Sequence, residues 1–153
     1  MPEPFEPAPD FTLPATGNQN VTLSALRQSC VVLYFYPRDD TTGCTRESIG
    51  FSELAEDFSS LGTCVFGISK DSLKKHEKFA AKHDILVPLL SDEHGHTCED
   101  YGVWKEKNMY GKTYMGIERT TFLIDGQGRI SRLWSRVKVP GHAHEVLEAV
   151  RGL

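Results

Sequence analysis

The residue best suited to chemistry is Cys44, which lies where an apolar run gives way to a helix. It stands in the stretch YPRDDTTGCTRES, and the apolar segment 30–36 leads into that stretch. The spacing predicts a helix over 43–61 that ends at Gly62. The apolar positions of this helix are Phe51, Leu54, Ala55, Phe58 and Leu61. Free N–H groups and the helix dipole favour negative charge in a first turn, so we expect a thiolate, the nucleophilic form of cysteine.

The neighbours of Cys44 would orient this thiolate. Apolar residues recur seven and fourteen positions later, so the sulfur should point toward the fold, into a shallow pocket that suits a small substrate. The hydroxyl of Thr41 is placed to cap the helix and to reach that pocket. Pro37 fixes the exit of the strand and shields one side of the sulfur. Gly43 leaves its backbone N–H open to close approach.

Two observations weaken this interpretation of the local pattern. Asp39 and Asp40 would oppose a thiolate unless they point outward, so a cation is required nearby. A free cysteine is also often a small buried apolar residue with no reactivity. The local pattern alone therefore leaves both a chemical and a packing role open for Cys44.

The rest of the chain alternates between strand and helix patterns. A proline-rich arm over 2–14 should be extended and lie on a domain edge. Two further strands, 120–125 and 129–135, should form an antiparallel hairpin through the turn at 125–128. The other expected elements are strands at 64–69 and 87–92, a helix from Ser72 to 83, a short helix or turn at 97–103, and a last helix from 142. This order predicts an α/β fold, a mixed central sheet flanked by helices, as in thioredoxin-like domains.

Length and charge narrow the class of protein. The 153 residues suit one compact domain, 1–153. The net charge is −4 and the basic residues are scattered, so no nucleic-acid or membrane partner is expected. No apolar run resembles a signal or a membrane span, which favours a cytoplasmic location. A small or neutral partner fits this surface better.

Three residues carry a resemblance to a known family. Pro37, Thr41 and Cys44 form the pattern P-x-x-x-T-x-x-C directly after a buried strand, and this pattern resembles the active-site signature of peroxiredoxins. The longer FYPRDDTTGCTRES and the block KEKNMYGKTYMGIERTTFLID resemble the peroxiredoxin Q group, also called bacterioferritin comigratory proteins. The likeness runs from APDFTL to VKVPGHA, nearly the whole chain.

The resemblance implies a thioredoxin-like fold and reduction of hydrogen peroxide or organic hydroperoxides by Cys44, without a metal or another cofactor. Arg119 matches the active-site arginine of the family and would supply the missing cation. Thr41, Arg119 and the backbone N–H groups of Gly43 and Cys44 would hold the peroxide oxygens. The product would be a sulfenic acid. The resemblance also suggests a monomer.

The return of that sulfenic acid to a thiol is the least determined step. Ile49, Ala80 and Ala81 occupy the regions where many members of the resembled group carry a resolving cysteine. Cys98 is a candidate resolver, because its polar segment GHTCEDYG should be exposed and mobile. A disulfide needs Cα atoms within about 7 Å, so that segment would have to move. We favour reduction by an external thiol: thioredoxin, glutaredoxin or glutathione.

The remaining polar and sulfur residues favour simpler roles. Cys30 and Cys64 open predicted buried strands and should be inert core residues. The histidines near Cys98 and in HAH lack the spacing of common metal sites, so no metal site is predicted. A thioredoxin-fold interaction or chaperone-like module, with a non-catalytic Cys44, is the competing function. Absence of a C-x-x-C pair weakens a third possibility, thiol–disulfide exchange.

Overall fold

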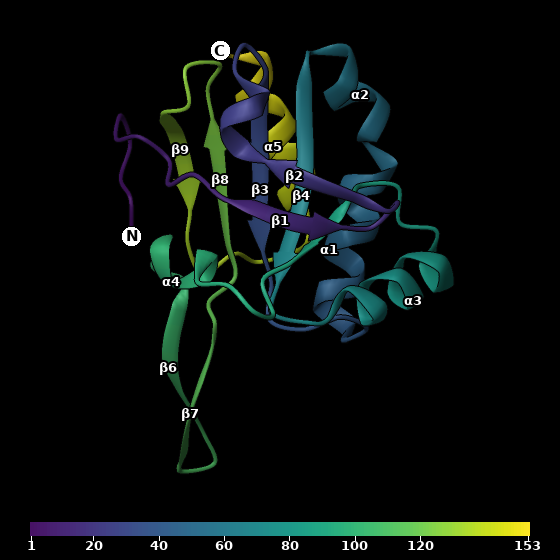
Figure 1. The fold of residues 1–153 in the computed structure, drawn as a ribbon, viewed down its shortest axis with the longest axis vertical. Coiled ribbons are helices and arrows are strands. Elements are labelled where there is room, and N and C mark those ends of the chain that lie inside the picture. Colours follow the sequence, from purple (N-terminus) through teal and green to yellow (C-terminus); the bar gives the residue numbers. More distant parts are fainter.

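A seven-stranded mixed sheet forms the centre of the computed structural model, which describes residues 1–153. The strand order is β2-β1-β5-β4-β3-β8-β9 (Figure 1). The strands β3, β4 and β5 run parallel, whereas β8 pairs antiparallel with β3, and β9 pairs antiparallel with β8. Their bounds are β1 Thr12–Ala15, β2 Gln19–Thr22, β3 Cys30–Phe35, β4 Thr63–Ser69, β5 Leu89–Ser91, β8 Thr120–Ile124 and β9 Ile130–Trp134. The predicted mixed sheet is confirmed.

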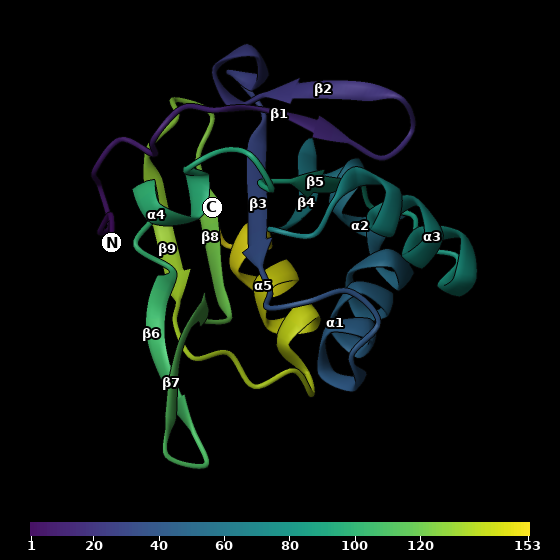
Figure 2. The same cartoon turned by 60° about the horizontal axis from the view of Figure 1, so that its bottom comes forward.

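Different elements cover the two faces of this sheet. One face packs against the helices α1 (Thr42–Glu53), α2 (Ala55–Ser60), α3 (Leu73–His83) and α5 (His142–Arg151). The β1–β2 hairpin, the 3₁₀ helix η1 (Leu23–Leu26) and the short helix α4 (Thr97–Asp100) lie against the other face (Figure 2). No helix combines the length and apolar character needed to cross a membrane.

Strand β3 separates two buried cores, which explains its unbroken apolar sequence. Val31, Leu33 and Phe35 belong to the core under β1 and α4. Val32 and Tyr34 alternate with them and belong to the core under α1, α3 and α5. Side chains of a strand alternate between faces, so a strand buried on both faces needs apolar residues at every position.

The predicted single helix over 43–61 is wrong, because it is broken at Leu54. Helix α1 ends at Glu53, and Leu54 leaves the helical conformation with φ −101° and ψ 9°. Its N–H turns back to the carbonyl of Phe51, and α2 then begins at Ala55. Phe58 remains fully buried, but Leu61 is 40% exposed. Apolar spacing predicted the buried face but not the break, which redirects the chain toward β4.

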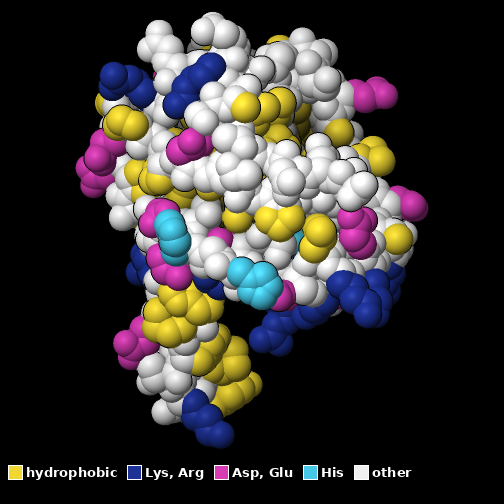
Figure 3. Space-filling view, viewed as in Figure 1, with side chains coloured by type: hydrophobic (Ala, Val, Ile, Leu, Met, Phe, Trp, Pro, Cys, Tyr) yellow, Lys and Arg dark blue, Asp and Glu magenta, His cyan; other side chains and the backbone are white.

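A second, two-stranded sheet was not expected from the sequence. Strands β6 (Trp104–Met109) and β7 (Lys112–Ile117) form an antiparallel hairpin that projects from the body (Figure 2). Tyr110 and Gly111 both have positive φ, 53° and 76°, which is the conformation of a type I′ hairpin turn. The hairpin carries exposed Met109 and Tyr110 side chains, and Figure 3 shows apolar groups gathered on it.

The N-terminal arm lies on the sheet edge, as predicted. The N–H of Phe5 donates to the carbonyl of Ile130, and the N–H of Ala8 donates to the carbonyl of Gly128. These bonds fasten the arm along β9, which is the last strand of the sheet. The loop to α1 begins at the C-terminal end of β3 (Figure 1).

Candidate active site

The pairing of β3 with β8 brings the two predicted key residues together. The strands are antiparallel, with Phe35 opposite Thr120. The end of β3 therefore meets the start of β8. The loop from β3 leads to Cys44 in the first turn of α1, and Arg119 stands just before Thr120. Residues 75 positions apart in sequence thus meet at one sheet end.

Cys44 is buried and faces a cation. Its side chain is 1% exposed, and Nη2 of Arg119 donates to its Sγ at 3.3 Å. A Cβ at Gly43 would stand 3.2 Å from the same Nη2, so glycine lets the guanidinium approach the first turn of the helix. The predicted inward-pointing sulfur is confirmed, and it is better enclosed than a shallow pocket implies.

Glu47 completes this arrangement and was missed by the sequence analysis. Its Oε1 accepts from Nη1 of Arg119 at 2.6 Å, so one guanidinium joins the carboxylate and the sulfur. Glu47 is 2% exposed, and its Oε2 has no hydrogen-bond partner. Burial raises the pKa of Glu47 to about 7, against the lowering effect of Arg119. Its position three residues after Cys44 places both on one helix face, a signal that could have revealed it.

Burial disfavours charge on Arg119, yet Glu47 and Cys44 raise its pKa above the ordinary value. The guanidinium therefore remains a cation beside the sulfur. A second cation, Lys107 of β6, lies close enough to interact with Arg119 and Cys44. Burial and then the charge of Arg119 lower the pKa of Lys107. The sequence analysis did not identify Lys107, because its strand was not predicted.

Thr41 occupies the N-cap position of α1 but does not cap the helix with its side chain. Its Oγ1 donates to the carbonyl of Arg38 at 3.0 Å, so the predicted capping bond is wrong. The first α-helical bond runs from the N–H of Thr45 to the carbonyl of Thr41. The N–H groups of Gly43 and Cys44 precede it and have no carbonyl acceptor within the helix.

Asp39 and Asp40 both have partners that offset their charge. Asp40 points outward, where Lys82 and His83 contact its two oxygens at 2.8 and 2.9 Å. Asp39 turns inward and lies 2.6 Å from Nδ1 of the buried His76. The acidic residues that weakened the sequence argument are thus compensated by other partners, while Arg119 is free to face Cys44.

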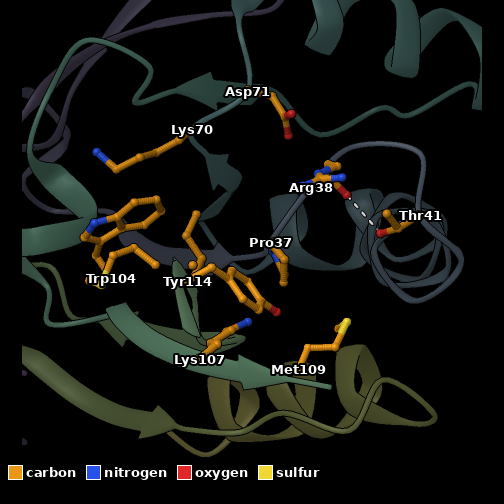
Figure 4. A pocket seen from close by; sticks show the side chains of 12 residues that line it. Pro37, Arg38, Thr41, Lys70, Asp71, Trp104, Lys107, Met109 and Tyr114 are labelled. Carbon is orange, nitrogen blue, oxygen red and sulfur yellow. Dashed lines mark hydrogen bonds between the residues drawn. The ribbon is translucent and has the colours of Figure 1, made fainter. Parts of the chain in front are cut away.

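A pocket of about 500 Å³ opens beside the loop that precedes Cys44. Pro37, Arg38 and Thr41 form one wall, and the hairpin residues Lys107 and Tyr114 stand opposite (Figure 4). Further lining comes from Lys70, Asp71, Trp104, Met109, Met115, Gly116 and Ile117. Cys44 does not line the pocket itself, which reaches its neighbours in the chain. The pocket has an apolar floor with several cations around it.

The other three cysteines lie away from this arrangement. Cys98 is fully buried in the core on the opposite face of the sheet, so its predicted exposure is wrong. The carboxylate of the buried Asp92 accepts the N–H of Cys98, which holds this residue in α4. Cys30 and Cys64 are only half-buried, at the start of β3 and β4, and burial raises the pKa of both thiols. All four cysteines are free thiols.

Comparisons with known proteins agree with this geometry. Residues 4–133 match the model of the AhpC/TSA family. The chain is 44% identical to peroxiredoxin Bcp of Xanthomonas campestris, over 95% of this chain and 92% of the relative. It is 43% identical to peroxiredoxin Bcp of Bacillus subtilis, over 95% and 93%.

Solved structures extend the comparison to the fold. A peroxiredoxin Q variant from Xylella fastidiosa superposes with a TM-score of 0.94 at 38% identity, covering 99% of this chain and 97% of that one. A bacterioferritin comigratory protein from Xanthomonas campestris, studied for its alkyl peroxide reduction activity, gives 0.88 at 42% identity, with 93% and 90% covered.

The fold and the site define a thioredoxin-like protein that acts as a thiol-dependent peroxidase. The chain belongs to the AhpC/TSA family, within its Bcp or peroxiredoxin Q group. The alternative of a non-catalytic interaction module is not favoured.

Proposed function

We propose that Cys44 is the peroxidatic nucleophile and that Arg119 holds its thiolate in position for attack on a hydroperoxide. The observation that carries this assignment is the bond of 3.3 Å from Nη2 of Arg119 to Sγ, made within the first turn of α1. A thiolate at this place has a cation and free N–H groups as neighbours. These donors also lie where negative charge develops on the peroxide oxygens.

In the reaction, the thiolate attacks one peroxide oxygen and the O–O bond breaks. The sulfur gains that oxygen and becomes a sulfenic acid, and the other oxygen leaves as water or an alcohol after taking up a proton. Arg119, the hydroxyl of Thr41 and the N–H groups of Gly43 and Cys44 hold the two oxygens in line. Pro37 covers one side of the site and limits access of water.

The adjacent pocket supports organic hydroperoxides as substrates alongside hydrogen peroxide. Its apolar floor suits an organic group whose peroxide end reaches toward Thr41. The Xanthomonas campestris relative studied for alkyl peroxide reduction is 42% identical to this chain. We extend that class of substrate to this protein.

An external thiol completes the cycle in this proposal. Cys44 and Cys98 lie in different cores on opposite faces of the sheet. A disulfide between them would require α4 to leave its place, so the proposed cycle does not use Cys98 as a resolver. Thioredoxin, glutaredoxin or glutathione would reduce the sulfenic acid, and the protein would act in the cytoplasm as a monomer.

The test follows loss of substoichiometric hydrogen peroxide in the presence of reduced protein. The wild type should consume it far faster than free cysteine, and Cys44→Ser should not. Cys98→Ser is the matched control, with the rate expected to stay at the wild-type value. Intact mass then separates the cycles: one added oxygen indicates a sulfenic acid, and loss of two hydrogens indicates a disulfide. A wild-type rate equal to that of free cysteine contradicts the proposal.

A further inference from the structure

The loop between β3 and α1 has one side chain that reaches into the buried interior, whereas its other contact with α3, from Asp40 to Lys82 and His83, is exposed. Pro37, Arg38, Asp40 and Thr41 are exposed, but Asp39 in their middle is 5% exposed. This loop carries two residues of the proposed site and leads directly to Cys44. The buried contacts of Asp39 therefore help to set the position of the loop.

The carboxylate of Asp39 contacts a buried histidine and a buried tyrosine. Oδ2 lies 2.6 Å from Nδ1 of His76, and Oδ1 accepts the hydroxyl proton of Tyr36 at 2.6 Å. Both partners are fully buried. Burial and the charge of Asp39 raise the pKa of Tyr36 well above its ordinary value, so its hydroxyl keeps its proton and donates. The backbone N–H of Asp39 donates to Asp71 at 2.8 Å.

His76 links this carboxylate to strand β5 of the central sheet. Its Nε2 lies 2.9 Å from the carbonyl oxygen of Leu90 in β5. A carbonyl only accepts, so Nε2 carries a hydrogen and donates. A second hydrogen lies between Nδ1 and Asp39, which makes a short, charge-assisted bond between two buried side chains. The imidazole of α3 thus links the loop before Cys44 to β5.

We propose that His76 is a positioning residue for the peroxidase reaction, acting through Asp39 on the loop that carries Pro37 and Thr41. This role rests on the proposed function of Cys44. The sulfur is held from one side by Arg119. The loop carries Thr41, whose hydroxyl would contact the peroxide in the proposed function. A displacement of the loop by about 1 Å would misalign the two sets of donors, and such misplacement costs up to about a hundredfold in rate.

Two substitutions of His76 separate positioning from simple packing. His76→Asn keeps a donor near the place of Nδ1, so it retains the bond to Asp39 and loses the bond to the carbonyl of Leu90. His76→Gln places its donor near the position of Nε2, so it retains the bond to Leu90 and loses the bond to Asp39. Both variants remove one buried bond and should lose similar stability. The second-order rate constant with hydrogen peroxide should fall about tenfold or more in His76→Gln and stay within about threefold in His76→Asn.

A double-mutant cycle tests the route through Asp39. Asp39→Ala should lower the rate at least as much as His76→Gln does, because it removes the contact with His76 and also the bond from Tyr36. The double variant should show no loss beyond that of Asp39→Ala, because the contact between Asp39 and His76 is already absent. Tyr101→Phe is the control for general destabilisation, since it removes a buried bond to Pro9 in the opposite core. Its rate should equal that of the wild type.

The rate of backbone amide hydrogen exchange at residues 39–45 measures how firmly the loop is held, independently of activity. Exchange should be faster in His76→Gln than in His76→Asn, even if the wild type proves not to be a peroxidase. Equal exchange in the two variants, equal rates in both, or additive losses in the double variant would overturn the role of His76. An inactive wild type with unequal exchange would contradict the proposed function and leave the loop contact established.

Discussion

Two cysteines of this protein share a helix N-terminus and nearly complete burial, yet their surroundings have opposite charge. Cys44 in α1 and Cys98 in α4 are 1% and 0% exposed. Each lies beside an ion pair, Arg119 with Glu47 at Cys44 and Lys70 with Asp92 at Cys98. At Cys44 the cation faces the sulfur, because Arg119 donates to Sγ. At Cys98 the neighbouring charge is the carboxylate of Asp92. Burial and then this carboxylate raise the pKa of the Cys98 thiol well above its ordinary value.

The difference shows that a helix N-terminus alone does not make a reactive thiol. In α4 the free N–H groups are already used: those of Thr97 and Cys98 donate to Asp92 at 3.1 and 2.8 Å. In α1 no side chain occupies the corresponding place, since Thr41 turns its hydroxyl to Arg38. The first turn of α1 is left for a substrate, and that of α4 is closed by a carboxylate.

The largest expected effect comes from removing the cation at Cys44. Arg119→Met should lower the second-order rate constant with hydrogen peroxide by about 10²–10³, as for loss of a preorganised donor in other active sites. Stopped-flow measurement of peroxide loss gives the constant. Arg119→Lys is the matched variant and should recover only part of the rate, because an ammonium cannot replace the fork that joins Glu47 and Cys44. A loss below about threefold in Arg119→Met would contradict the view that the cation beside the sulfur distinguishes Cys44 from Cys98.

A second prediction concerns the carboxylate at Cys98. Asp92→Asn should lower the free energy of unfolding by about 1–3 kcal/mol, because the amide leaves a buried backbone N–H without its acceptor. The pKa of Cys98 should fall toward its ordinary value, and the peroxide rate should not change. Chemical denaturation and thiol titration measure the two effects. Asp100→Asn, which alters an exposed carboxylate of the same helix, should change stability by no more than about 0.5 kcal/mol.

A third prediction distinguishes the two thiols by function. Cys98→Ala should cost about 1–2 kcal/mol of stability through lost packing, with the peroxide rate constant within about twofold of the wild type. Cys44→Ala should abolish the rate. If Cys98→Ala also stopped turnover with an external thiol while sparing the first peroxide reaction, Cys98 would be the resolver and the comparison would need revision.

The smallest effect is a change in the pH dependence of stability at Glu47. Its pKa of about 7 lies above the ordinary value of 4.5, so the folded protein binds this proton more tightly than the unfolded chain. The resulting stability is present below about pH 4.5 and is lost as the pH rises to about 7. Glu47→Gln should remove that decline, so its stability relative to the wild type should rise across this window.

His142 provides the control with the opposite sign. Burial lowers the pKa of His142 to about 4 from the ordinary 6.5. Its contribution to the stability of the protein is therefore present above pH 6.5 and is lost as the pH falls toward 4. His142→Gln should remove the rise in stability between about pH 4 and 6.5, so the decline due to Glu47 should become steeper over the range that the two windows share. Denaturant unfolding at several pH values between 4 and 8 measures both variants. Parallel curves for wild type and Glu47→Gln would contradict the buried ionisation at the site.

Local pattern was enough to predict much of the fold and part of the site. The apolar run at β3, the helix after it and the hairpin of β8 and β9 follow from periodicity, which depends only on neighbouring residues. The hairpin of β6 and β7 escaped because its side chains are mostly exposed and show no alternation of apolar and polar residues. The break at Leu54 escaped because it depends on where α2 must pack.

The sequence by itself determined that a cysteine stands at a helix start and made Cys44 the candidate nucleophile, since both follow from residues close to Cys44. It also provided Arg119 as a candidate through resemblance. Only the tertiary structure decided which charge meets each sulfur: antiparallel pairing of β3 with β8 delivers Arg119 to Cys44, and the end of β5 delivers Asp92 to Cys98. Electrostatic interaction depends on distance in space. Arg119 and Cys44 are 75 positions apart and meet only once the sheet is assembled, whereas Asp92 and Cys98 are six positions apart and meet through the local fold between β5 and α4.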